Sequence, residues 1–327
     1  MTRLLLPALT LLVALLFVAS LMIGYTPAGL GESLTALATG DGPLGLVMRE
    51  IRLPRALLGV MIGLSLGLAG AAMQGYLRNP MAEPGILGVS GMAALGAVIS
   101  IHFGLSTLWP LALPLAALMG AVVGVALILA LAGPRGGSVT LILAGIAISA
   151  LAGAFTSLVL NLAPNPWAAN EIVFWMMGSL ADRSWLHVSL AAPFIIVGAV
   201  VLLLQGKALD ALTLGEDAAE SLGLSLGRVR IWLVLGTAAV VGAGVAVAGS
   251  VGLVGLVVPH LLRPFVKGKP SSLLPAASLG GAALILAADV AVRVLLPTGD
   301  LKLGVLTALV GAPLFLHLIW KMRRGLA

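Results

Sequence analysis

The longest acidic cluster in this sequence consists of Glu216, Asp217 and Glu220, within the segment Gly215–Gly223. Glu216 and Glu220 are four residues apart, so a short helix would place both carboxylates on one face. Charged residues make up only 9% of the chain, and clustered charges in such a chain mark where it meets other molecules. The segment is predicted to be either a docking helix for a partner or a solvated loop that separates two apolar segments.

A second group is cationic. Arg52, Arg55 and Arg293 stand at the ends of apolar segments, and arginine binds carboxylates through a planar fork that stays charged at any relevant pH. Lipid headgroup binding is the alternative. Asp289 lies four residues before Arg293, so the two share a helical face, and a structural ion pair is favoured over a proton relay.

Catalytic and metal chemistry has no visible residues. There is no Gly-rich P-loop motif and no cysteine, and the four histidines are in different segments. No metal ligand set, cofactor site or catalytic group is therefore predicted, and the chain is interpreted as a non-enzyme. The net charge of +6 comes from Lys and Arg scattered at segment ends, which does not predict nucleic-acid binding.

Composition predicts an all-α polytopic membrane protein. Over 327 residues, 60% are hydrophobic, and the mean hydropathy is +1.16. We expect one membrane domain, 1–327, in contact with lipid. About ten transmembrane helices are predicted near 4–24, 56–76, 85–104, 109–132, 139–162, 186–205, 229–248, 251–266, 273–295 and 303–321. The first segment is interpreted as a transmembrane helix because it is longer than the apolar part of a usual secretory signal.

The basic residues predict an orientation. Most Lys and Arg residues fall in the same set of loops if both termini are cytoplasmic. The longest inner loop is then 206–228, which carries the acidic cluster. Six basic residues fall on the outer side against this trend, namely Arg49, Arg52, Arg55, Arg183, Arg293 and Lys302.

Small and polar residues inside the spans have more ordinary interpretations. Gly59, Gly63 and Gly67 repeat at four-residue intervals, which predicts close helix packing. Gln74 either bonds across helices or lines a pore, and the pore is slightly favoured. The prolines and glycine of Asn79-Pro80 through Pro84-Gly85 prevent a plain helix there.

Six motifs in order resemble the FecCD family of permease subunits. They are Arg52-Leu53-Pro54-Arg55; Gln74 with Asn79 to Gly88; Gly215 to Gly223; Gly252 to Arg263; Asp289 with Arg293; and Gly304 with Gly311-Ala312-Pro313. The resemblance runs from about residue 50 to 320. It implies the type II architecture of ABC importers for iron-siderophores, haem and cobalamin, in the inner membrane.

The resemblance also implies partners and site residues. The permease would be a homodimer, with two ATP-binding subunits that hold ATP and Mg and a periplasmic substrate-binding protein. The segment 206–228 would form the coupling loop, with its ATPase contact at Glu216, Asp217, Ala219, Glu220, Leu222 and Gly223. Arg52, Arg55 and Arg293 would dock the binding protein. Ser138 and Thr140 resemble an inner gate, although they are equally interpreted as helix caps.

The predicted function is import of an iron chelate, either haem or a ferric siderophore. A cobalamin permease of the same family is the alternative. An ion-driven secondary transporter would need ionisable residues near the membrane midplane, and Asp289 is the single candidate. A membrane-embedded enzyme would need a catalytic constellation that the sequence lacks.

Overall fold

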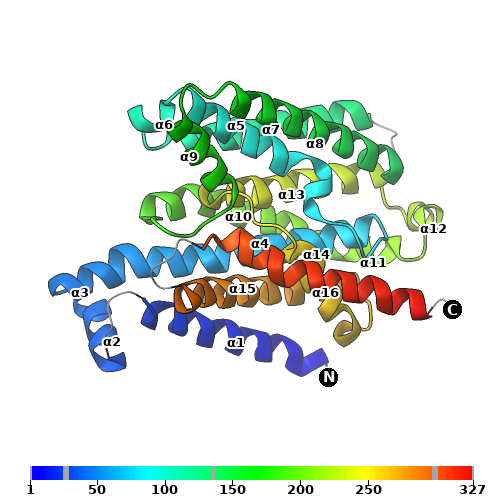
Figure 1. Ribbon diagram of the computed structural model, residues 1–327. Coiled ribbons are helices and arrows are strands. Elements are labelled where there is room, and N and C mark those ends of the chain that lie inside the picture. The colour runs from blue at the N-terminus through cyan, green and yellow to red at the C-terminus, as the bar shows by residue number, and fades with distance from the viewer. Residues whose placement is uncertain (1, 25–28, 134–136, 297–300, 326–327) are drawn as a thin grey trace.

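The computed structural model describes residues 2–24, 29–133, 137–296 and 301–325, and all regular structure in these ranges is helical (Figure 1). Seven helical segments are long and apolar enough to cross a membrane, and three shorter apolar helices accompany them. The predicted all-helical membrane fold is therefore confirmed. The long helices are α1 (Thr2–Met22), α4 (Leu53–Tyr76), α7 (Ala112–Ala132), α8 (Ser138–Asn161), α10 (Trp185–Leu204), α13 (Leu226–Ala248) and α15 (Pro270–Leu295). The shorter apolar stretches are α5 (Val89–His102), α14 (Val254–Leu262) and the part Leu303–His317 of α16 (Leu303–Gly325).

Several short elements connect these helices. They are α2 (Leu30–Thr39), α3 (Gly42–Leu46), the π-helix η1 (Val47–Arg52), the 3₁₀-helix η2 (Pro84–Leu87), α6 (Leu105–Leu108), α9 (Pro166–Met176), α11 (Gly206–Leu212), α12 (Glu216–Ser221) and the 3₁₀-helix η3 (Arg263–Val266). The sequence did not predict α2 or α9, which are too short to span a membrane. The predicted span 251–266 is broken, because α14 ends at Leu262 and continues as η3.

Helix α4 lies at the centre of the bundle and packs against α15, α14, α13 and α10. Glycines make these contacts close. A Cβ atom on Gly67 would lie 1.9 Å from the Ala277 carbonyl oxygen of α15, and one on Gly70 would lie 1.9 Å from the Gly255 carbonyl oxygen of α14. The predicted packing role of the α4 glycine stripe is confirmed, since backbone meets backbone along it.

The segment between α4 and α5 folds back into the bundle. Glu83 accepts a hydrogen bond from the backbone N–H of Leu253 at 2.9 Å, across 170 residues of sequence. Leu253 precedes α14 and has φ +68, a left-handed conformation that is rare for leucine. Gly88 ends η2 with φ +74, and a Cβ there would lie 2.8 Å from Ile148 Cγ2 of α8. The predicted break in the helix at Asn79 to Gly85 is confirmed.

The two ends of the bundle differ in what they carry. In Figure 1 the beginning of α1, the end of α16 and α12 lie at one end of the bundle, whereas α2, α3 and α6 lie at the opposite end. We call the end with α12 the inner end and the other the outer end, in line with the predicted orientation. Both groups of charged residues singled out above therefore lie at opposite ends of the same bundle.

Candidate functional site

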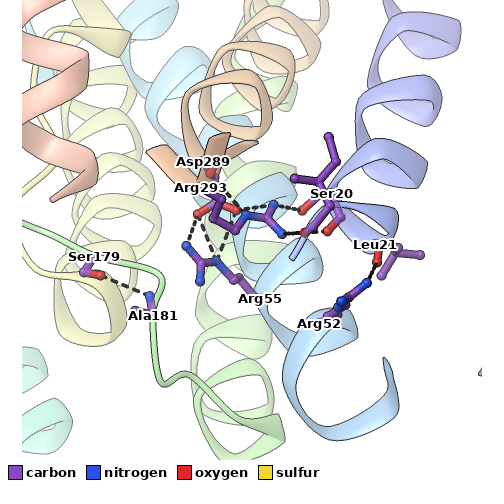
Figure 2. A network of polar contacts seen from close by, with 9 residues as sticks. Ser20, Leu21, Arg52, Arg55, Ser179, Ala181, Asp289 and Arg293 are labelled. Atoms are coloured by element: carbon purple, nitrogen blue, oxygen red, sulfur yellow. Dashed lines mark hydrogen bonds and ion pairs between the residues drawn. The ribbon is translucent and has the colours of Figure 1, made fainter. Parts of the chain in front are cut away.

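An outer arginine cluster, defined as Arg52, Arg55, Asp289 and Arg293, joins α1, η1, α4 and α15 (Figure 2). The side chain of Asp289 is 2% exposed and binds two cations. Arg293 Nη2 lies 2.8 Å from Asp289 Oδ2, and Arg55 Nη2 lies 2.8 Å from Asp289 Oδ1. The predicted ion pair between Asp289 and Arg293 is confirmed, and Arg55 is a second partner that donates through both Nε and Nη2.

Two arginine side chains of this cluster, Arg52 and Arg293, bind the end of α1. Arg52 Nη1 donates to the carbonyl oxygens of Leu21 at 2.9 Å and Met22 at 3.1 Å. Arg293 donates to the Ser20 carbonyl oxygen and to Ser20 Oγ, each at 2.8 Å. The last carbonyls of a helix lack intrahelical partners, and cationic donors are favourable there. Arg52 and Arg293 therefore cap α1.

This arrangement narrows the predicted docking site. Arg52 is 5% exposed and Arg293 is 7% exposed, and both guanidinium groups are used within the chain. The Arg55 side chain is 15% exposed and lines an outer cavity. Arg293 also lines this cavity, but Arg55 is the most exposed of the three, and docking by Arg52 and Arg293 would require them to leave α1.

The outer cavity has a volume of about 1160 Å³ and lies between η1, α9, α15 and the segments that precede α10 and α16. Its wall includes Arg55, Arg183, Lys302, Phe174 and Trp175. Sequence reasoning assigned no role to Arg183 or Lys302. Their predicted place on the outer side, where few basic residues are expected, could have marked Arg183 and Lys302 as candidate functional residues.

The acidic helix α12 is exposed at the inner end. Asp217 and Glu220 are exposed, Glu216 has a 37% exposed side chain, and Leu222 after the helix is 66% exposed. Ala219 was expected on the docking face, and this expectation is wrong: Ala219 is fully buried in the core. The short helix is delimited by Gly215 and Gly223, whose positive φ values of 110 and 85 suit glycine.

The preceding helix α11 fixes the position of the acidic helix. Asp210 Oδ1 accepts from the backbone N–H of Ser271 at 2.8 Å, at the start of α15, and Lys269 lies 3.7 Å from Asp210 Oδ2. The acidic helix is held by the buried Ala219 and by an ion pair from Arg78 Nη2 to Glu216 Oε1 at 3.4 Å. A cavity of about 320 Å³ lies under it and is lined in part by Ser138.

Gln74 is buried and bonds across helices. It is 1% exposed, its Nε2 donates to the Leu256 carbonyl oxygen at 3.1 Å, and its Oε1 accepts from Arg263 Nη2 at 2.7 Å. The favoured pore position of Gln74 is thus replaced by the alternative, a brace between α4 and α14. Its partner Arg263 is 189 residues away, so no local pattern could reveal the pair.

Ser138 and Thr140 begin α8. Gly137 occupies the N-cap position and no side chain caps the helix, so the capping interpretation is wrong for both residues. Ser138 is half-buried and Thr140 is exposed. Their role as a gate remains a prediction.

Metal ligation finds no support in the geometry. Within the ranges that the structure describes, no three His, Asp or Glu side chains are close enough to hold a metal ion. The structure thus places its polar chemistry in ion pairs, helix ends and the two cavities.

A multi-pass helical bundle with a broken helix, an exposed acidic loop at one end and a polar cavity at the other is typical of a membrane permease. A family model, the FecCD transport family, matches residues 11–321, and the chain belongs to this family. Among curated relatives, the hemin transport system permease protein HmuU of Yersinia pestis is 38% identical over 98% of this chain and 96% of its own length. The vitamin B12 import system permease protein BtuC of Vibrio cholerae is 41% identical over 84% of this chain and 82% of its own.

A solved structure agrees with this assignment. The inward-facing conformation of an ABC transporter described as metal-chelate type matches with a TM-score of 0.86 and 32% identity, over 97% of this chain and 98% of that one. Family membership accounts for the agreement between the six sequence motifs and the arrangement of helices seen here.

Proposed function

We propose that this protein is the membrane permease subunit of a binding-protein-dependent ABC importer for an iron chelate, either haem or a ferric siderophore. A cobalamin permease of the same family is the alternative. The observation that carries the proposal is full-length similarity to a hemin permease, at 38% identity over 98% of the chain. The assembly would contain two copies of this chain as one membrane domain each, two ATP-binding subunits that hold ATP and Mg, and one periplasmic binding protein.

The acidic helix is the proposed contact with the ATP-binding subunit. It presents Asp217, Glu220 and the apolar Leu222 to solvent beside the partly exposed Glu216. Mixed apolar and charged surface of this kind suits a protein interface. Because Asp210 ties the neighbouring α11 to α15, displacement of the acidic helix would move the membrane helices as a rigid body.

The proposed location is the bacterial inner membrane, with both termini cytoplasmic. The distribution of basic residues supports this orientation. The beginning of α1 and the end of α16 lie at the same end of the bundle as the acidic helix (Figure 1), which is consistent with one shared cytoplasmic side.

The test is reconstitution of the permease with its ATP-binding subunit and binding protein in proteoliposomes. We expect ATP-dependent uptake of haem, a ferric hydroxamate chelate or cyanocobalamin, measured by trapped iron or cobalt. Glu216→Arg and Glu220→Arg should each lower uptake and ATPase stimulation by at least about tenfold, because charge reversal opposes docking by like-charge repulsion. Asp41→Arg, an exposed position near α3, is the matched control and should retain ATPase binding.

The competing ion-driven mechanism makes the opposite prediction. Asp289, its candidate proton carrier, is held by two arginines at 2.8 Å, so its carboxylate serves as the shared anion of a structural ion pair. Uptake by the permease alone under a proton or sodium gradient, without nucleotide, would overturn the proposed function.

A further inference from the structure

The outer cavity contains a cation that the mechanism above does not use. Arg183 lies in the segment between α9 and α10 and lines the cavity of about 1160 Å³. This volume is at or above the range of about 300–1,000 Å³ that is usual for small-molecule sites.

Arg183 differs from its neighbours in how its charge is compensated. Arg52, Arg55 and Arg293 bind carbonyl or carboxylate oxygens, whereas no described carboxylate forms an ion pair with Arg183, and its Nε is buried without an acceptor. Burial lowers the pKa of Arg183 and the adjacent Asp182 raises it. A largely buried guanidinium without its own anion is costly to the fold, which calls for a functional explanation.

The rest of the wall is aromatic and cationic. Phe174 and Trp175 project from α9, and Lys302 Nζ lies 5.3 Å from the centre of the Phe174 ring. Trp175 Nε1 is a second buried donor without an acceptor. Flat aromatic surface beside the guanidinium of Arg183 matches a flat, largely apolar ligand that carries a carboxylate.

Two acids also line the cavity, and their positions matter. Glu171 and Asp182 are exposed, so water and salt screen their charges. Arg183 is recessed, and its interaction with a carboxylate is screened less. A recessed cation is also better placed for a small molecule that enters the cavity than for a flat protein surface.

We propose that the outer cavity is a subsite for carboxylate-bearing planar chelates, with Arg183 as the residue that binds a ligand carboxylate. This inference rests on the proposed function and narrows its substrate class. Haem carries two propionate carboxylates on a flat ring, whereas cobalamin carries amides, so the subsite favours haem-like cargo and disfavours cobalamin.

The test uses the assembled transporter in lipid nanodiscs without nucleotide. Haemin binding is measured by Soret absorbance and by quenching of tryptophan fluorescence, with empty nanodiscs subtracted. We expect Arg183→Gln to weaken haemin binding by about tenfold, the usual loss for one charge-assisted hydrogen bond. Arg183→Lys should recover part of the affinity. Arg228→Gln, an exposed arginine at the inner end of α13, is the matched control and should bind as the unaltered protein does.

A second ligand separates carboxylate recognition from apolar adsorption. Iron protoporphyrin dimethyl ester keeps the ring and lacks free carboxylates, so we expect it to bind at least about tenfold more weakly than haemin and to be insensitive to Arg183→Gln. Equal binding of haemin and its ester, or equal haemin binding by the Arg183→Gln variant, would overturn the inference. If ATP-driven uptake persists in that case, the proposed function stands; absence of any ATP-driven uptake would instead reject the proposed function.

Discussion

The outer arginine cluster and the inner acidic helix are both dense groups of charge, yet the protein uses them differently. At the outer end, Asp289 is 2% exposed and binds two arginines at 2.8 Å. At the inner end, Glu216 has a 37% exposed side chain and one ion pair at 3.4 Å. The first group stabilises the chain, and the second leaves most of its charge available. A dense group of charges therefore does not by itself identify a surface that contacts a partner. Whether the group is buried or exposed distinguishes a structural ion-pair network from a contact surface.

The largest expected loss of folding stability comes from removal of the Asp289 carboxylate at the outer end. Asp289→Asn keeps the size of the side chain and leaves Arg55 and Arg293 without a counterion. We expect a loss of stability of about 3–5 kcal/mol, the usual result when one partner of a buried ion pair is removed. Thermal unfolding in detergent measures it, with Glu216→Gln as the exposed control. Similar shifts for the two variants would mean that burial does not set how much these two charged groups stabilise the protein.

A smaller loss of folding stability is expected when Arg52, which caps the end of α1, is replaced. Arg52→Ala deletes hydrogen bonds from a cation to the Leu21 and Met22 carbonyls. We expect a loss of about 1.5–3 kcal/mol, with faster hydrogen exchange in the last turn of α1. Mass spectrometry of exchanged peptides localises the change. Unaltered exchange in α1 would mean that Arg52 does not hold this helix.

The smallest effect is expected at the inner end. Arg78→Ala removes the ion pair to Glu216, in which both side chains are more than a third exposed. We expect a loss of about 0.2–1 kcal/mol that disappears in high salt, since exposed ion pairs are weak and screened. A loss comparable to that of Asp289→Asn, or one independent of salt, would place the acidic helix among the buried structural groups.

Hydropathy predicted the membrane spans well because every backbone polar group within a bilayer must be bonded inside its own segment. The same argument could not predict α9 or α2, which are too short to cross and carry no such constraint. Pro259, His260 and Arg263 in the predicted span 251–266 indicate a broken helix, and the structure places the break after Leu262, where η3 begins.

The candidate sites were predicted in part. The pairing of Asp289 with Arg293 follows from their four-residue spacing, whereas Arg55 joins them from 234 residues away. Ala219 was misplaced because a six-residue helix gives no hydrophobic pattern to fix its buried face. The sequence showed that Arg183 is a basic residue on the outer side, against the general trend. It could not show that no described carboxylate forms an ion pair with Arg183, because that depends on the folded structure.

The glycine contacts of α4 have a mechanical consequence. Gly63, Gly67 and Gly70 set this helix directly against the backbone of α15 and α14, with no side chains between them to repack. A sliding movement along these contacts would bring carbonyl groups into collision. Helices α4, α14 and α15 therefore form one rigid unit. A movement that opens a path for cargo must then displace other helices relative to these three, which would move together as a single unit.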